Sequence, residues 1–216
     1  MKSFAVVGLG RFGMQLARSL ASQGAEVLAI DRVRKNVDEV ADEVTRAVIA
    51  NIQDKDVMTE LGVTECDCVI LAFGGDLAAS VISLMNLKSL GVKKIICKAY
   101  DQTHKDVLLK LGADQVIIPE QEIADKLANQ LVSPMLRDYI SLTDGYVLEE
   151  ISAPSFWQDR TLAELRIRSR YKADIIAIRR GGKMMISPCG DDFIRKDDVL
   201  VLLGETKALD DIRKLR

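Results

Sequence analysis

The sequence is poor in the residues that build metal, redox and catalytic centres. Its 216 residues include one histidine and one tryptophan, and aromatic side chains make up 5%. The cysteines form no C-x-x-C pair, and Cys68 and Cys97 fall in apolar, strand-like stretches. We therefore expect Cys68 and Cys97 to be small buried side chains rather than metal or redox groups.

A strong charge excess and a long apolar run are also lacking. The formal net charge of −2 argues against general affinity for nucleic acid. No apolar run approaches the length of a membrane span, and the N-terminal run lacks the basic segment and cleavage site of a signal peptide. With 48% hydrophobic residues, which is ample for a packed core, the chain is expected to be soluble and cytoplasmic.

Two catalytic patterns are missing as well. The sequence has no Walker loop of the form G-x-x-x-x-G-K-[ST], which serves phosphoryl transfer, and no recognisable set of nucleophile, base and orienting group. The chemistry of this chain is therefore expected to end at binding.

The sequence does have a nucleotide-binding motif at its start. An apolar strand at residues 3–7 leads into a G-x-G-x-x-G run of Gly8, Gly10 and Gly13, a helix follows, and a second strand ends on Asp31. In such a motif Gly8 permits the tight turn, Gly10 lets the backbone approach phosphate, and Gly13 lets the helix pack against the strand. The helix N-terminus offers N–H groups to phosphates, and Asp31 is placed to accept hydrogen bonds from ribose. The alternative is a tight turn that needs glycine only for packing.

The rest of the pattern predicts an α/β fold, a Rossmann-like doubly wound parallel sheet, followed by a small α+β domain. Strands alternate with helices over the first 130 residues, which gives six short strands with crossover helices. We place the Rossmann-like domain at residues 1–133, a crossover helix and linker at 134–144 with a short helical piece at 135–140, and the α+β domain at 145–216. The second domain is near the lower size limit for independent folding, so it is expected to rely on a partner.

Polar residues follow the carboxyl ends of the predicted strands, where such sheets bind ligands. Asn51 follows the third strand, Gly74 and Gly75 follow the fourth, Lys98 ends the fifth, and Glu120 follows the sixth. An amide can read a base or ribose edge, and a lysine supplies charge for phosphate. A glutamate beside phosphates is explained if a divalent cation such as Mg²⁺ lies between them. Surface solvation or capping is the alternative for each residue singly.

Two residues near this edge have competing interpretations. Arg11 lies inside the glycine loop, where it either reaches the phosphates or is a solvated loop charge. His104, the single histidine, is expected to be a helix-surface residue rather than a catalyst.

The helix that begins at Pro119 carries an apolar stripe. Ile123, Leu127 and Leu131 lie at i, i+4 and i+8, and the stripe is expected to continue through positions 136 and 140. Because both faces of the sheet already have helices, we expect a two-fold partner to bury the stripe. The alternative is that the stripe covers its own sheet.

Several segments resemble those of a known family. They are F-A-V-V-G-L-G-R-F-G, V-I-A-N, the C-K-A that closes the fifth strand, L-G-A-D-x-V-I-x-P-E and the small C-terminal domain. Over essentially the entire chain they resemble the RCK-type cytoplasmic regulatory subunits of bacterial Trk/Ktr potassium transporters (the TrkA/KtrA family). The resemblance implies a protein peripheral to the inner face of the cell membrane that gates an integral-membrane potassium transporter subunit (TrkH/KtrB-like). It implies a homodimer assembling into an octameric ring, whose shape depends on ATP or ADP.

The resemblance also implies which residues form the nucleotide pocket. Arg11 would reach the terminal phosphate of the neighbouring subunit's nucleotide, and Glu120 would help to hold a cation there. Some family members bind NAD or NADH, and Asp31 is compatible with the ribose of either kind of nucleotide. The residues of the glycine loop and those that match the family's pocket are Gly8, Gly10, Arg11, Phe12, Gly13, Asp31, Arg32, Asn51, Ile52, Phe73, Gly74, Gly75, Lys98, Ala99, Tyr100, His104 and Glu120.

For the second domain, the resemblance implies a site for cyclic di-AMP at a dimer interface. Arg168 matches the phosphate-contacting position. The apolar wall of that site is matched by Leu162, Ala163, Ile176 and Pro188. The sequence departs from the family pattern in two places, because Ala163 replaces a larger aliphatic residue and an Arg-Arg pair occupies 179–180 where some relatives have histidine.

Two other functions stay open at this point. The first 31 residues alone suggest a nicotinamide-dependent oxidoreductase, although neither a proton donor near the nicotinamide nor a substrate pocket is recognisable. A stand-alone nucleotide sensor that acts on a soluble partner is the other possibility.

Overall fold

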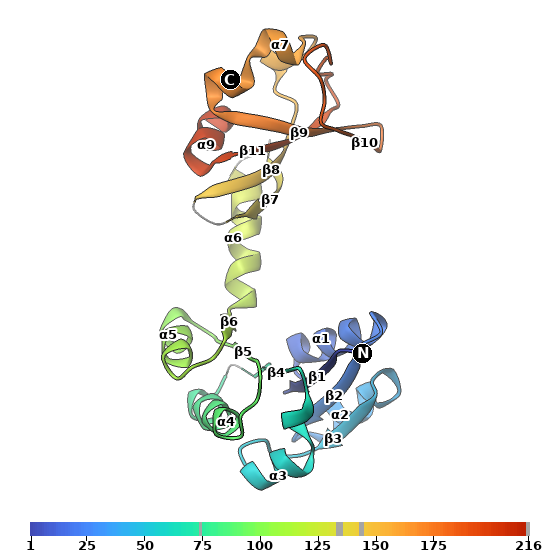
Figure 1. The fold of residues 1–216 in the computed structure, drawn as a ribbon, viewed down its shortest axis with the longest axis vertical. Coiled ribbons are helices and arrows are strands. Elements are labelled where there is room, and N and C mark those ends of the chain that lie inside the picture. Colours follow the sequence, from blue (N-terminus) through green and yellow to red (C-terminus); the bar gives the residue numbers. More distant parts are fainter. Residues whose placement is uncertain (74, 133–135, 143–144, 215–216) are drawn as a thin grey trace. The chain divides into compact units, whose positions relative to one another are not determined.

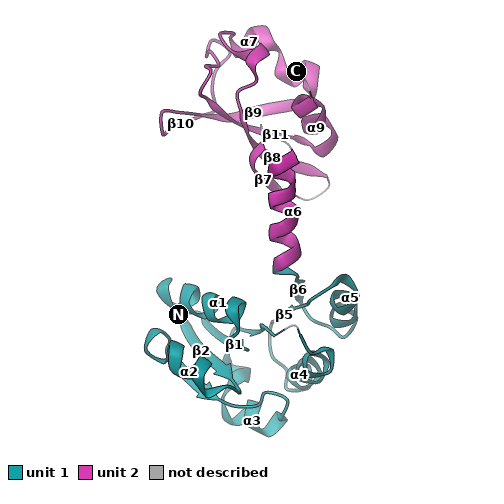
Figure 2. Cartoon of the chain, turned by 180° about the vertical axis from the view of Figure 1, so that it is seen from behind, with its two compact units in different colours: residues 1–119 teal, residues 120–216 magenta. Residues whose placement is uncertain are grey.

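The computed structural model describes residues 1–73, 75–132, 136–142 and 145–214, apart from the side chain of residue 141. The chain divides into two compact units, Met1–Pro119 and Glu120–Arg216 (Figure 2). Each unit has its own sheet and its own core. The sequence-based domain limits, with a linker at 134–144, stay a prediction.

The first unit is a parallel sheet in the order β3-β2-β1-β4-β5-β6 (Figure 1). The strands are β1 (Ser3–Val7), β2 (Glu26–Asp31), β3 (Arg46–Ile49), β4 (Cys68–Leu71), β5 (Ile95–Lys98) and β6 (Gln115–Ile117). The helices are α1 (Arg11–Ser22), α2 (Arg34–Val40), α3 (Lys55–Glu60), α4 (Leu77–Ser89) and α5 (Gln102–Lys110), with 3₁₀ turns at Ala41–Glu43 and Val63–Glu65. The strand order reverses between β1 and β4, and such a switch point is where open α/β sheets bind ligands. The predicted doubly wound sheet is confirmed.

Alternating side chains of the strands build a core on each face of this sheet. In β1, Ala5 and Val7 belong to one hydrophobic cluster, whereas Val6 belongs to the other, together with Ala17 of α1. Strand β4 is buried along its whole length, as expected for a central parallel strand with helices on both sides. This double-sided packing fixes the register of the strands, and with it the edge formed by their carboxyl ends.

Aspartates begin three of the helices in the first unit. Asp54, Asp76 and Asp101 accept hydrogen bonds from backbone N–H groups in the first turns of α3, α4 and α5. An acceptor at this position satisfies N–H groups that the helix itself cannot. Helix α1 differs, because its capping residue is Gly10, which has no side chain to serve this purpose.

The second unit is an antiparallel sheet in the order β10-β9-β11-β8-β7. Its strands are β7 (Leu136–Ser141), β8 (Tyr146–Ser152), β9 (Ala173–Arg180), β10 (Lys183–Ile186) and β11 (Val199–Glu205). Its helices are α6 (Pro119–Val132, from residue 120 on), α7 (Leu162–Leu165), α8 (Ile167–Tyr171) and α9 (Thr206–Lys214), with a 3₁₀ turn at Ser155–Trp157. Trp157 is buried at the centre of the core. The predicted α+β architecture of this part is confirmed.

The helical piece predicted at 135–140 is wrong. Residues Leu136–Ser141 form strand β7, which pairs antiparallel with β8; residue 135 lies outside the described residues. A short apolar run fits a helix and a strand equally well, and the choice depends on available partners. Here the edge of β8 provides a partner, and Leu136 is buried in the core of the second unit.

The apolar stripe of α6 stays exposed. None of the fourteen residues of this helix, all of which are described, is buried. Ile123, Leu127 and Leu131 are 66%, 53% and 73% exposed. The predicted continuation of the stripe fails because Leu136 belongs to a strand.

The carboxylate of Glu149 lies within the core of the second unit. Strand β8 turns Val147, Glu149 and Ile151 inward. One Glu149 oxygen lies 3.1 Å from Nη1 of Arg213 on α9, whereas the other has no hydrogen-bond partner among the described residues. Burial raises the pKa of Glu149 above its ordinary value, and the charge of Arg213 opposes this. This charged contact adds to the packing of Leu209 and Ile212, which holds α9 against the sheet.

The cysteines behave as small hydrophobic residues in the first unit. Cys68 and Cys97 are buried as predicted, and Cys66 is buried as well. Burial raises the pKa of the Cys97 thiol to about 12, so the reactive thiolate is suppressed. Among the described residues, no helix is long and apolar enough to cross a membrane.

Candidate functional site

The glycine loop lies at the switch point of the first sheet. Gly8 directly follows β1, has a φ of +89° and donates its N–H to the carbonyl of Ile30 at 2.8 Å. A Cβ at Gly8 would lie 3.0 Å from the ring of Phe73, which follows β4. A Cβ at Gly13 would lie 1.9 Å from the carbonyl oxygen of Gly8. Both glycines are thus required by the packing of the loop itself.

Gly10 is different, because nothing in the chain requires it to be glycine. Its φ of −71° is open to any residue. Apart from Gly10 itself and its two chain neighbours, no residue of the described chain has an atom within 4 Å of the position that a Cβ would take. The residue is exposed and caps α1, so the first N–H groups of that helix face this open space. A bare, positively polarised helix end beside empty space is suited to a phosphate.

Asp31 already holds three hydrogen bonds from the chain. Its carboxylate accepts the N–H of Leu9 at 2.6 Å, the N–H of Val33 at 2.8 Å and the side-chain amide of Asn36 at 3.2 Å. The carboxylate therefore fastens the glycine loop to the end of β2. A carboxylate has about four acceptor positions, so about one is left for a ligand hydroxyl.

Lys98 and Phe12 connect the end of β5 to the glycine loop. The Nζ atom of Lys98 lies 5.8 Å from the centroid of the Phe12 ring, within the range of a cation–π contact. Phe12 lies in the first turn of α1, and Lys98 is the last residue of β5. The structure thus brings together two residues that are 86 positions apart in the sequence, at the edge where a ligand is expected.

His104 is not a helix-surface residue, contrary to the sequence-based expectation. It is 1% exposed, and its ring lies against that of Tyr100 with the centroids 4.8 Å apart. Neither ring nitrogen has a hydrogen-bond partner among the described residues. Burial lowers the pKa of His104, with Asp101 opposing the shift, so the ring is neutral at pH 7. It can shape the pocket only through Tyr100 or after a local rearrangement.

The other predicted residues fall into three groups. Arg11, Arg32, Asn51 and Gly75 are exposed and therefore accessible to a ligand. Ile52 and Ala99 are buried, so they can meet a ligand only through their backbone. Gly74 lies outside the described residues.

Glu120 is described separately because it belongs to the second unit. It lies in the first turn of α6 and is exposed, and its role at a nucleotide stays a prediction. Among the described residues, no group of three His, Cys, Asp or Glu side chains is arranged to hold a metal ion. A cation at this place would therefore need phosphate oxygens for most of its ligands.

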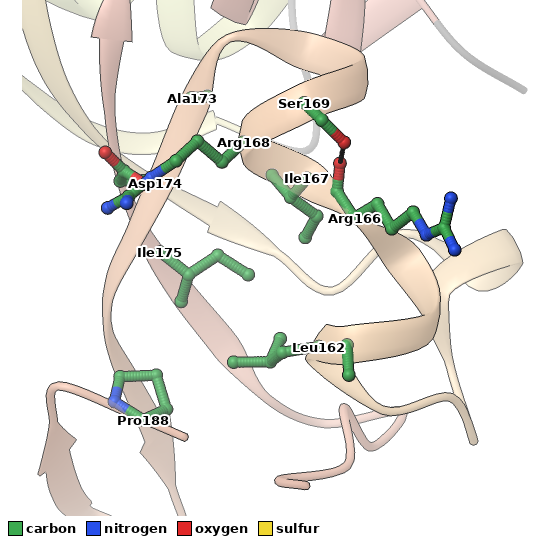
Figure 3. Close-up of a pocket in the computed structure, with 10 residues that line it drawn as sticks. Leu162, Arg166, Ile167, Arg168, Ser169, Ala173, Asp174, Ile175 and Pro188 are labelled. Carbon is green, nitrogen blue, oxygen red and sulfur yellow. Dashed lines mark hydrogen bonds and ion pairs between the residues drawn. The ribbon is translucent and has the colours of Figure 1, made fainter. Parts of the chain in front are cut away.

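A second pocket, of about 410 Å³, lies in the second unit (Figure 3). We use the name second pocket for the cavity lined by Leu162, Ala163, Arg166, Ile167, Arg168, Ser169, Ala173, Asp174, Ile175 and Pro188. Thr161 begins α7 with a capping box closed by Glu164, which fixes the helical wall. The size falls within the usual range of ligand pockets.

Four of the five residues predicted for a second ligand line this pocket. They are Leu162, Ala163, Arg168 and Pro188, whereas Ile175 takes the place predicted for Ile176. The pairing of β9 with β11 is irregular at this point, because Leu202 pairs with Ile175 and Val201 pairs with Ala177, so the register skips Ile176. The prediction also missed Asp174, which accepts a hydrogen bond from Nε of Arg168 at 2.6 Å. Strand alternation alone could not have identified Asp174 and Ile175 together, because Ala173, Asp174 and Ile175 are consecutive residues and all three line the pocket.

The fold and the site define a class of protein, a Rossmann-type nucleotide-binding unit joined to a small antiparallel domain. Residues 4–119 match the TrkA-N domain, and residues 146–216 match the TrkA-C domain. The Ktr system potassium uptake protein C of Bacillus subtilis (strain 168) is 38% identical over 99% of this chain and 96% of that protein. Protein A of the same system is 37% identical, over 96% of this chain and 94% of that protein. This chain therefore belongs to the TrkA/Ktr family of potassium uptake proteins.

Solved structures agree with this assignment at the level of the fold. The GsuK channel aligns with 99% of this chain with a TM-score of 0.71 and 19% identity. The GsuK channel bound to NAD aligns with 96% of the chain with a TM-score of 0.66 and 18% identity. The chain spans only 39% and 38% of those channel chains, so the likeness concerns the fold of a part of each.

Proposed function

We propose that this chain is a nucleotide-sensing regulatory subunit that gates a membrane potassium transporter from the cytoplasmic side. The observation that carries the proposal is Gly10. The chain's own packing requires Gly8 and Gly13 but not Gly10, whose missing side chain leaves the N-terminus of α1 open at the switch point. A bound phosphate explains that residue, and the family relatives are potassium uptake proteins.

The ligand of the first unit is proposed to be ATP or ADP, with NAD or NADH as the alternative. Asp31 has about one acceptor position left, enough to hold one ribose hydroxyl. Because all four ligands have such a hydroxyl, this contact does not distinguish them. The phosphates must therefore distinguish ATP and ADP from NAD and NADH. Arg11 supports ATP and ADP, because it is exposed in the first turn of α1, where a long cation can reach a terminal phosphate.

Glu120 and a cation such as Mg²⁺ would complete the phosphate site. The described residues offer no protein cage for a metal, and this fits Mg²⁺, which usually takes one or two carboxylates together with phosphate oxygens. Glu120 would be that carboxylate. The cation would neutralise charge on the phosphates, while Arg11 orients the terminal one.

The exposed stripe of α6 supports a homodimer that assembles into an octameric ring. Ile123, Leu127 and Leu131 present apolar surface that the described chain does not cover. A second copy of the same helix, related by a two-fold axis, would bury it. Nucleotide-dependent changes in the ring would then be transmitted to the transporter subunit.

Gating requires the nucleotides to distinguish two ring shapes. A ligand can shift an equilibrium only by the difference between its affinities for the two states. ATP and ADP differ by the terminal phosphate, so the group that contacts this phosphate carries the signal. Arg11 is the residue of this chain placed to do so.

For the second pocket we propose cyclic di-AMP. Leu162, Ile175 and Pro188 supply an apolar surface suited to an adenine, and Arg168 supplies donors for a phosphodiester. The departure at Ala163 leaves the wall smaller than in the family pattern. Arg179 and Arg180 are not among the residues that line the pocket, and they pair with Glu150 and Asp198.

The rival functions lead to different measurements. An oxidoreductase would turn over NADH, and a stand-alone sensor would bind nucleotide without affecting potassium transport. Neither rival explains the family match over both units.

The test has two parts. Calorimetry of the full chain against ATP, ADP, NAD and NADH is expected to show an adenine nucleotide binding with a Kd below about 1 mM, and no NADH oxidation. Proteoliposomes containing the membrane potassium transporter subunit are then expected to take up potassium at rates that differ between ATP and ADP only when this chain is present. Absence of nucleotide binding, or identical uptake with ATP and ADP, would refute the proposal.

A further inference from the structure

The second pocket contains a carboxylate next to its main cation. Nε of Arg168 lies 2.6 Å from Oδ1 of Asp174, and both residues line the pocket. Figure 3 shows Arg168 reaching toward Asp174, whereas the side chain of Arg166 points away from both Ile175 and Pro188. The part of the pocket around Arg168 therefore carries a positive and a negative charge side by side.

The geometry of this pair leaves Arg168 able to bind a ligand. The contact with Asp174 uses Nε, and a guanidinium group has further donors on its two terminal nitrogens. The side chain of Arg168 is 84% exposed and that of Asp174 is 40% exposed. Both residues line the pocket and both side chains stay accessible, so a ligand whose phosphate contacts Arg168 also meets the carboxylate of Asp174.

A carboxylate in this place changes which anions bind well. An isolated arginine attracts a ligand more strongly as the ligand's charge increases, so it would favour ATP over a phosphodiester. A neighbouring carboxylate cancels most of that attraction beyond contact distance, while the short hydrogen bonds to the terminal nitrogens remain. Each additional negative charge on the ligand then meets repulsion from Asp174.

We infer that Asp174 is a specificity-determining residue of the second pocket, which favours phosphodiesters, with one charge per phosphate, over phosphomonoesters and polyphosphates. This inference rests on the proposed nucleotide function of that pocket. It also gives the pocket a means to reject ATP, the ligand proposed for the first unit. Like-charge repulsion of an unwanted ligand is a common source of specificity.

A purely mechanical role for Asp174 leads to a different expectation. If the carboxylate only held Arg168 in place, losing it would weaken every phosphate ligand by a similar factor. If the charge of Asp174 selects among ligands, losing this charge tightens binding, and the ligand with the most negative charge gains most. The ratio of the affinities for a less charged and a more charged ligand therefore separates the two roles.

The experiment uses the full chain with the first unit saturated by ADP. A fluorescent cyclic di-AMP is displaced by unlabelled cyclic di-AMP and by linear pApA, which has the same two adenosines but ends in a phosphomonoester with about one more charge. In Asp174→Asn, which keeps an oxygen acceptor for Arg168, the preference for cyclic di-AMP over pApA is expected to shrink about threefold to fivefold at low salt. Asp211→Asn removes the same charge from exposed surface of α9 and should leave the preference unchanged.

Each outcome is decisive once melting curves show that both variants are folded. A smaller preference in Asp174→Asn alone, with the difference fading as salt is added, supports the inference. An unchanged preference, or equal weakening of both ligands, overturns it while the cyclic di-AMP proposal stands. Failure of the wild-type chain to bind cyclic di-AMP overturns that proposal, and the assignment of Asp174 with it.

Discussion

The second and third glycines of the loop, Gly10 and Gly13, should respond to substitution in opposite ways. Gly13→Ala places a Cβ 1.9 Å from the carbonyl oxygen of Gly8, more than 1 Å inside the 3.0 Å that such contacts respect. The obstacle is backbone, so no side chain can rotate away, and α1 must shift from the sheet. Gly10→Val places its side chain in space that is empty of the chain's own atoms.

The magnitudes follow from these distances. Forcing an extra group into packed structure costs typically 1–3 kcal/mol, and a backbone clash belongs at the upper end, at about 3 kcal/mol. For a unit of this size that lowers the melting temperature by about 10 °C. Gly10→Val removes a residue that is acceptable at a helix cap, which costs about 1 kcal/mol or less. It should nevertheless block the approach of a phosphate to α1.

The chain provides separate reporters for the two units. Trp157 is its single tryptophan and is buried in the second unit, so its fluorescence follows the unfolding of that unit. Circular dichroism follows both units. Gly13→Ala is expected to lower the transition seen by circular dichroism for the first unit and to leave the Trp157 transition in place. Gly10→Val is expected to keep both transitions and to lose nucleotide binding in calorimetry.

Two results would show this reasoning to be mistaken. A Gly13→Ala protein as stable as wild type would mean that the loop does not pack as described. A folded Gly10→Val protein that binds ATP with unchanged affinity would mean that the nucleotide lies elsewhere.

Three further predictions concern the phosphate, the assembly and the second core. Arg11→Ala should weaken ATP about tenfold or more in calorimetry and ADP much less, because a charge-assisted phosphate contact is worth about 1.5–3 kcal/mol. Leu127→Asp combined with Leu131→Asp should give monomers in light scattering. Burial raises the pKa of Glu149 above 4.5. Between about pH 4.5 and the pKa of the folded state, Glu149 therefore keeps a proton in the native state that it loses in the unfolded chain. The stability of the second unit should therefore fall as the pH rises from about 4.5 through the folded pKa, and Glu149→Gln should flatten this slope in Trp157 melts.

Each of these predictions has a control. Equal losses for ATP and ADP in Arg11→Ala would indicate a general electrostatic role. Gln121→Asp with Ala128→Asp adds the same two charges elsewhere on exposed surface of α6 and should leave the oligomer intact. For the pH slope, burial acts to raise the pKa of Asp198, but hydrogen bonds from Arg180 and from a backbone N–H hold it below 3.8. Asp198 therefore titrates too low to account for the slope, and persistence of the slope in Glu149→Gln would contradict the assignment.

Elements with strong local signals were predictable from the sequence. The strand, glycine loop and helix at the start were found because each glycine has a local task, and Pro119 marked a helix start that the structure confirms. Strand β7 was missed because its identity depends on β8, a partner that a local pattern does not reveal. Pairing decides such ambiguous segments, and pairing is a property of the whole fold.

The sites were predictable in type but not in detail. The prediction that His104 is exposed was wrong, because a helix pattern does not show that the ring of Tyr100 lies against that position. The partners of Asp31 include the N–H of Leu9, a backbone group whose placement only the folded loop determines. Asp174 was overlooked because a carboxylate in an anion pocket contradicts the simple expectation of positive charge.

The energetics of assembly bear on how a ring could be gated. The three stripe residues of α6 are half to three-quarters exposed, so burying them in both copies of a dimer yields roughly 1–2 kcal/mol each, or about 6–12 kcal/mol. Association itself costs about 4–15 kcal/mol, so the stripe alone gives a marginal dimer. A ring of dimers also needs a second interface, for which Ile82 and Met85 on α4 offer further exposed apolar surface. Marginal contacts suit a gate, because a nucleotide whose differential affinity is only a few kcal/mol can rearrange them.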